Sequence, residues 1–128
     1  MKVSQKQWLY SQIYLYIQQQ KYTKAITLLK ALNMLAPNDF YVTKSLARSY
    51  LGAGNHLLAS KYAELAIHHS QDYNSDSKEL ALLHLIKSRA QLKLNQMIQA
   101  KESLDHFINF RQQSLKVTDK HPTQKTTI

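Results

Sequence analysis

Hydrophobic residues recur at helical spacing along most of the chain, with short polar runs between the apolar segments. This pattern predicts six amphipathic helices, at about 8–17, 25–35, 39–51, 57–69, 77–94 and 98–110. Asp39 and Asp76 stand where a side-chain acceptor would cap a helix, and Gln18 to Lys21 make a polar turn. With only two glycines and two prolines in 128 residues, the pattern favours an all-α fold with short connections.

Residues 39–70 carry small and large side chains at the spacing of a tetratricopeptide repeat, a helical hairpin unit. With Tyr50 at position 11 of the unit, Ala47 and Ala59 fall where the two helices approach most closely, and Gly54 falls in the turn. The alternative is an ordinary amphipathic hairpin with small contact residues. A true repeat should recur along the chain, and this one does.

One repeat length earlier in the chain, Tyr16 takes the position of Tyr50 and Ala25 that of Ala59. In a third unit Ala100 takes the position of Ala59, after an insertion in the polar run 71–77, where extra residues cost little. We therefore predict three repeats, at about 6–38, 39–71 and 78–111, stacked as a short right-handed solenoid with a concave groove. Residues 112–128 are predicted to be a short helical extension that fades into a flexible polar tail. The predicted repeat-packing residues are Tyr16, Ala25, Ala47, Tyr50, Gly54, Ala59 and Ala100.

The chain is basic, with 17 lysines and arginines against 8 acidic residues and a net charge of +9. These cations are scattered along every predicted helix, which leaves three interpretations: a solvated surface, an acidic protein partner or nucleic acid. There is no cysteine, and no apolar run reaches the length of a signal peptide or a membrane span. We expect a cytoplasmic protein that does not insert into membranes.

Residues with catalytic or metal-binding potential are few. The six histidines form no i, i+4 pair and have no nearby carboxylate at ligand spacing, so no metal site is predicted. Gly52 and Gly54 fall in one predicted hairpin turn, and two glycines cannot build a phosphate-binding loop. We expect neither a cofactor nor enzyme activity, which leaves binding.

In stacked helical hairpins, the first helix of each unit lines the concave face. The positions expected to face inward combine aromatic, aliphatic and cationic side chains, a mixture typical of protein-binding hot spots. The alternative is that some of them, above all Leu82 and Leu85, belong to the core between helices. The predicted groove residues are Tyr10, Tyr14, Ile17, Tyr41, Lys44, Arg48, Leu51, Leu82, Leu85 and Arg89.

Two segments carry a resemblance to a known family. They are the run from Ala25 to Leu32 followed by Leu35-Ala36-Pro37, and the run Ser88-Arg89-Ala90-Gln91 followed by Ala100. Over residues 7 to 111 the chain resembles the small three-repeat chaperones of bacterial type III secretion systems, most closely the SctY (YscY) kind. The resemblance implies a cytoplasmic, non-catalytic protein that forms a heterodimer with the small secreted component SctX and brings it to the export gate.

Other functions remain open at this point. The chain could be a chaperone of a needle subunit or a translocator. It could also be a basic repeat adaptor for an acidic partner or nucleic acid, although we do not predict nucleic acid as the partner. Salt separates the classes, because phosphate binding weakens steeply as salt rises whereas an apolar groove binds nearly unchanged.

Overall fold

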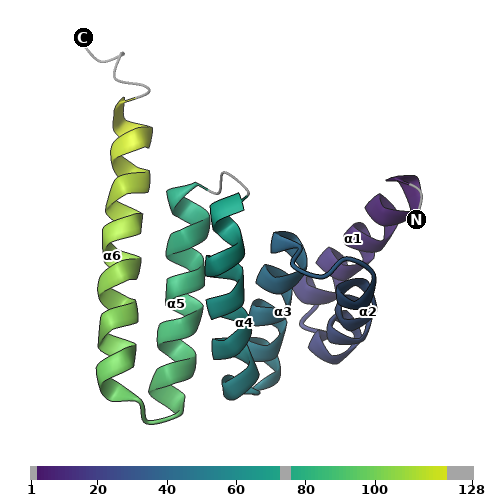
Figure 1. Ribbon diagram of the computed structural model, residues 1–128, viewed down its shortest axis with the longest axis horizontal. Helices are drawn as coiled ribbons and strands as arrows, with labels where there is room; N and C mark the ends of the chain where they lie inside the picture. The colour runs from purple at the N-terminus through teal and green to yellow at the C-terminus, as the bar shows by residue number, and fades with distance from the viewer. Residues whose placement is uncertain (1–2, 73–75, 121–128) are drawn as a thin grey trace.

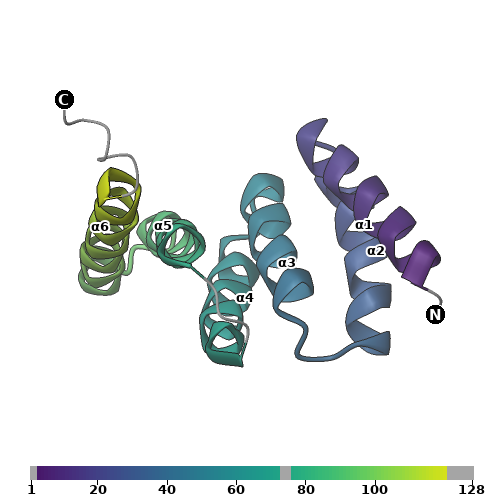
Figure 2. The same cartoon turned by 90° about the horizontal axis from the view of Figure 1, so that it is seen from above.

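The computed structural model describes residues 3–72 and 76–120, and over these residues the protein is all helical (Figure 1). The helices are α1 (Val3–Gln18), α2 (Tyr22–Leu35), α3 (Phe40–Ala53), α4 (His56–His69), α5 (Ser77–Lys93) and α6 (Met97–Lys120), with a short 3-10 turn at Ser70–Asp72. They follow one another across the molecule in chain order, from α1 and α2 at one end to α6 at the other (Figures 1 and 2). The predicted all-α class is confirmed.

Side-chain caps mark where three of these helices begin. The Asp39 carboxylate accepts from the amides of Tyr41 and Val42, and the Asp76 carboxylate accepts from the amide of Glu79 at 2.9 Å. Asn55 caps α4 through a 3.2 Å bond from the amide of Leu58. These acceptors satisfy amide groups that have no partner within the helix, so the polar signals in the sequence place the helix starts.

The three hairpin turns have one geometry. Gln20, Gly54 and Asn95 each adopt a left-handed backbone, with φ of 61°, 85° and 62°. Each turn is closed by the same backbone hydrogen bond, from Lys21 to Tyr16 (2.7 Å), Asn55 to Tyr50 (2.9 Å) and Gln96 to Gln91 (2.9 Å). The turns therefore recur at the same repeat positions that the sequence pattern indicates.

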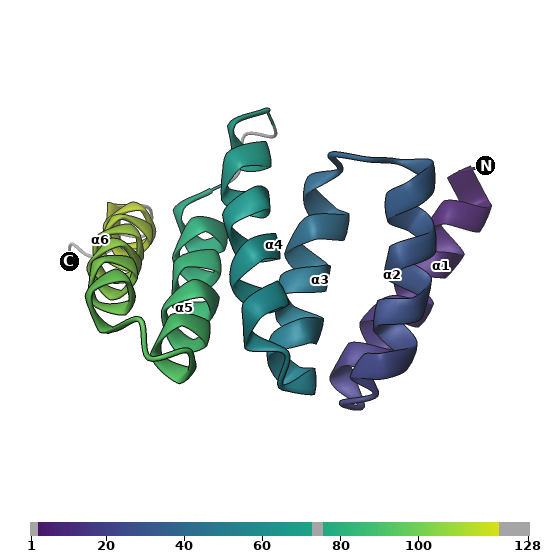
Figure 3. The same ribbon diagram turned by 60° about the horizontal axis from the view of Figure 1, so that its bottom comes forward.

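Small residues allow the helices to pack closely. Ala25, Ala47 and Ala59 are fully buried, Tyr50 and Ala100 are nearly so, and Tyr16 is half-buried against the core. Gly52 lies inside α3 rather than in the predicted turn, and any side chain at this position would overlap the ring of Tyr22 on α2. The core runs continuously from α1 to α5, and α2, α3 and α4 stand side by side within it (Figure 3).

The last helix is longer than the predicted segment 98–110. It continues through most of the segment predicted as a tail, to Lys120, while residues 121–128 lie outside the described part of the chain. Phe110 stacks on His84 of α5 with ring centroids 5.4 Å apart, and Gln113 lies 3.3 Å from the Ser77 hydroxyl. Phe110 lies at the end of the predicted segment and Gln113 in the first turn of the extension, so α6 contacts α5 as far as the start of α5 at Ser77, and this contact favours helix there.

Candidate functional site

The first helices of the three hairpins converge on one cavity of about 560 Å³. Tyr14 and Ile17 reach it from α1, Tyr41 and Arg48 from α3, and Leu82 from α5. These residues come from sites far apart in the sequence, and only the stacking of α1, α3 and α5 brings them together. The full lining is Tyr14, Ile17, Gln18, Tyr41, Lys44, Ser45, Arg48, Lys78, Leu82 and Ile86.

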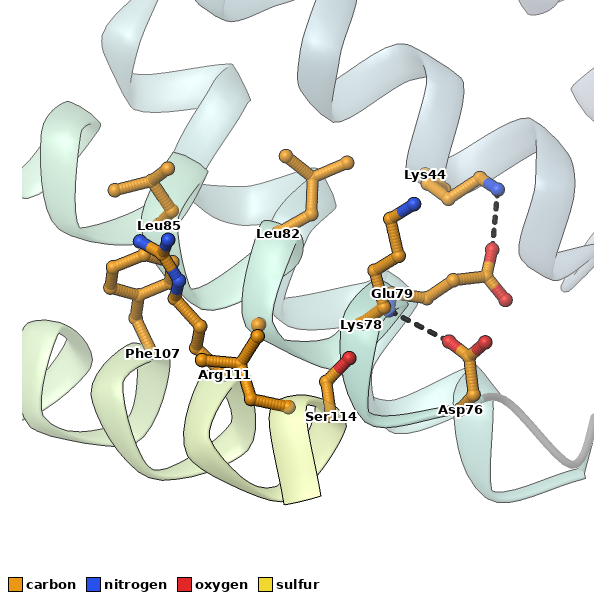
Figure 4. Close-up of a pocket in the computed structure, with 11 residues that line it drawn as sticks. Lys44, Asp76, Lys78, Glu79, Leu82, Leu85, Phe107, Arg111 and Ser114 are labelled. Carbon is orange, nitrogen blue, oxygen red and sulfur yellow. Dashed lines mark hydrogen bonds and ion pairs between the residues drawn. The ribbon is translucent and has the colours of Figure 1, made fainter. Parts of the chain in front are cut away.

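A second cavity, of about 790 Å³, continues from the first and shares Lys44, Lys78 and Leu82 with it. Figure 4 shows Leu82 and Leu85 of α5 beside Phe107 and Arg111 of α6. The remaining lining residues are Asp76, Glu79, Ala81, Ser114 and Leu115. We call the two cavities together the groove.

Cations dominate the charge in the groove. Lys44 forms a 2.7 Å ion pair with Glu79 that ties α3 to α5, and its ammonium group lies 5.7 Å from the ring centre of Tyr41. Arg48 and Lys78 are exposed, and no described carboxylate lies within ion-pair distance of either. The first cavity has no acidic residue in its described lining. A ligand that combines apolar groups with carboxylates would match this surface.

Tyr10 and Tyr41 form the aromatic wall between α1 and α3, with ring centroids 4.3 Å apart. Burial raises the pKa of the Tyr41 hydroxyl above its usual range, although a hydrogen bond with Ser45 opposes the shift. The hydroxyl therefore stays protonated at neutral pH and remains able to donate a hydrogen bond.

Seven of the ten predicted groove residues line the groove: Tyr14, Ile17, Tyr41, Lys44, Arg48, Leu82 and Leu85. Ile17 is 8% exposed, so it forms the floor of the groove and part of the core. Tyr10 and Leu51 pack against the core, and Arg89 is exposed outside both cavities. Leu51 is half-buried and packs against the two core clusters that contain Tyr50 and Ala47.

The lining residues that the sequence did not predict come from all four helices of the groove. Gln18, Ser45 and Ile86 lie near predicted residues on α1, α3 and α5, and Asp76, Glu79 and Ala81 lie at or near the start of α5. Lys78 lies in the first turn of α5, and Phe107, Arg111, Ser114 and Leu115 lie on α6. The α6 residues recur at steps of three and four, which is a helical signal. When the sequence is taken alone, the polar composition of residues 112–128 outweighs that signal and predicts a short helical extension that fades into a tail.

Comparisons with known proteins gave no relatives: no protein-family model matches the chain, and no curated protein is similar to it. Within the described residues, no group of three or more His, Asp or Glu side chains is placed to hold a metal ion. Across the same residues, no helix combines the length and apolar character needed to cross a membrane.

Proposed function

We propose that this protein is a tetratricopeptide-like chaperone of a type III secretion system, whose groove binds a segment of a small SctX-like secreted component and helps deliver it to the export gate. The observation that carries the proposal is the first cavity, where aromatic, aliphatic and cationic side chains from α1, α3 and α5 converge. Such a mixture is typical of protein-binding hot spots. The resemblance of the sequence motifs to those of SctY-like chaperones is the reason for proposing an SctX-like partner.

The charged and apolar side chains of the groove indicate which residue types a bound segment should carry. Arg48 and Lys78 favour carboxylates, while Ile17, Leu82 and Leu85 favour apolar side chains. We therefore expect an extended or helical segment in which acidic and apolar residues alternate on one face. A needle subunit or a translocator with such a segment is the second candidate within the same class.

The experiment is a binding assay with purified SctX-like partner. Tyr41→Ala and Arg48→Ala should each weaken binding about thirtyfold, because truncating a central anchor costs roughly 2 kcal/mol or more. Lys30→Ala and Lys61→Ala are the matched controls and should remain close to wild type, since both lysines are exposed on the second helices of their hairpins. Circular dichroism checks that all four variants fold.

The same assay tests the basic-adaptor alternative. If Arg48→Ala, Lys30→Ala and Lys61→Ala each lose the same small amount of affinity, if Tyr41→Ala loses none, and if binding weakens steeply as salt rises, the net charge of the protein carries the binding. That result would remove the groove from the proposal and leave an electrostatic adaptor for nucleic acid or an acidic partner.

A further inference from the structure

One ion pair lies where the two cavities of the groove meet. It joins Lys44 of α3 to Glu79 of α5 (Figure 4). Lys44 lines both cavities and Glu79 lines the second. Their side chains are 27% and 36% exposed, so both can be reached from the groove although neither is fully solvated. A segment that extends from one cavity into the other therefore passes beside this pair.

The start of α5 does not require the Glu79 side chain to point into the groove. Asp76 and Glu79 have the spacing of a capping box, a motif in which the glutamate side chain returns to the backbone amide of the capping residue. Here the Asp76 carboxylate accepts from the Glu79 amide at 2.9 Å. Among the described residues, the Glu79 carboxylate accepts from Lys44 Nζ at 2.7 Å instead of returning to Asp76. Asp76 thus caps α5 without the Glu79 carboxylate, which faces α3.

Lys44 differs from the other cations of the groove because it already has an anionic partner. The cations of the groove with no described carboxylate within ion-pair distance are Arg48, Lys78 and Arg111. The Lys44 ammonium group also lies 5.4 Å from the ring centre of Phe40 and 5.7 Å from that of Tyr41. Both rings attract this charge, so Lys44 keeps its place when its carboxylate partner is exchanged. Glu79 therefore occupies a position that a carboxylate of a bound segment would take.

We propose that Glu79 is a specificity-determining residue of the groove: it competes with acidic residues of the bound segment for Lys44 and so directs their carboxylates to Arg48 and Lys78. This inference rests on the proposed function of the groove as a site for acidic and apolar side chains. A carboxylate bound at Lys44 must break the 2.7 Å pair and leave Glu79 without its partner. Specific interfaces use such a repulsive group beside the attractive ones.

A purely structural ion pair predicts a different result when Glu79 is changed. If the pair only joins α3 to α5, Glu79→Gln loosens the wall of the groove, and binding weakens or stays the same. If Glu79 competes for Lys44, the same variant frees the ammonium group and strengthens the binding of an acidic segment. The chain offers a matched pair for comparison, because Lys87 and Glu64 join α5 to α4 and line neither cavity of the groove.

The test uses a short capped peptide as the probe and the full-length protein as the receptor. Leucine and glutamate alternate at every second position of the peptide, with serine between them, so an extended chain presents both on one face. Isothermal titration calorimetry measures the Kd. Glu79→Gln should bind this peptide about threefold to fivefold more tightly than the wild type, which is the size of a screened ion-pair contribution. The same peptide with glutamine in place of glutamate should show no such gain.

Two further variants assign the gain to Lys44. Glu64→Gln removes the acid of the matched pair and adds the same charge to the protein, and it should leave the affinity unchanged. Lys44→Met combined with Glu79→Gln should lose the gain, because the freed ammonium group is then absent. The proposal is overturned if Glu79→Gln binds the acidic peptide no better than the wild type does, or if Glu64→Gln gains as much. A wild-type protein that does not bind the acidic peptide, or whose binding survives Arg48→Ala unchanged, contradicts the proposed function of the groove itself, and this inference with it.

Discussion

At the scale of single residues, His84 is the least expected feature. It is 7% exposed on α5, its ring lies 4.9 Å from that of His106 and stacks on Phe110, and its Nδ1 atom has no hydrogen-bond partner among the described residues. Burial lowers the pKa of His84 to about 4, and the nearby His106 adds to the shift. The imidazole is therefore neutral at physiological pH and acts as a packing group between α5 and α6.

This shift makes stability depend on pH in a defined window. The unfolded chain takes up a proton on His84 below its ordinary pKa of 6.5, while the folded chain does so only near pH 4. The free energy of unfolding should therefore decrease as the pH falls from 6.5 towards 4, and this contribution should be absent above 6.5. Urea denaturation across this range should show that His84→Gln removes part of the decrease. His68→Gln, at an exposed position, should leave it in place; equal slopes in both variants would contradict the assignment.

At the scale of elements, the hairpin turns share a backbone but differ in sequence. Gly54 suits its left-handed conformation, whereas Gln20 and Asn95 hold the same conformation with a side chain. Glutamine incurs a steric penalty in that region which glycine does not. Of the three turn residues, Gln20 in the first hairpin is therefore the least favourable for a left-handed backbone.

We expect substitutions at the turns to act in opposite directions. Gly54→Ala should destabilise the protein by about 1 kcal/mol through the backbone alone, because an added methyl group at Gly54 would meet no atom within 4 Å. Gln20→Gly should stabilise it by a similar or smaller amount. Chemical denaturation measures both. Gln19→Gly, one residue earlier in the same turn, is the control and should not stabilise the protein; a gain equal to that of Gln20→Gly would contradict the conformational explanation.

At the scale of the whole molecule, apolar side chains line the groove, and others are exposed on the last hairpin at Leu92, Leu104 and Ile108. Large exposed apolar patches are rare on soluble monomeric proteins, and where they occur they usually mark interaction sites.

Binding should therefore change the stability of the whole fold. Saturating SctX-like partner should raise the melting temperature, since a ligand at a hundred times its Kd stabilises the folded state by about 2.7 kcal/mol. Arg48→Ala should lose most of this increase while the melting temperature of the free variant stays near that of the wild type, because Arg48 is exposed. Differential scanning calorimetry with and without partner measures both quantities. An increase that survives in Arg48→Ala would place the binding surface outside the groove.

The sequence by itself determined the local structure. Apolar spacing predicted the six helices, Asp39 and Asp76 marked helix starts, and the repeat spacing, with one insertion before the third unit, predicted which turns would match. These features depend on interactions within a few residues, so a single sequence carries them. Most of the residues predicted to face inward line one of the two cavities of the groove, because helical periodicity decides which face of its helix a residue occupies.

Only the tertiary structure decided which side chains are buried in the core and which line a cavity. Leu51 was predicted for the groove and is half-buried against the core, because packing by neighbouring helices depends on distances that periodicity does not contain. Residues 112–128 were predicted to be a short helical extension that fades into a tail, whereas α6 continues to Lys120 and its Gln113 contacts Ser77 of α5. The second cavity depends on that helix, because Arg111, Ser114 and Leu115 line it. Its existence is a property of how α5 and α6 pack, which no local pattern in the chain specifies.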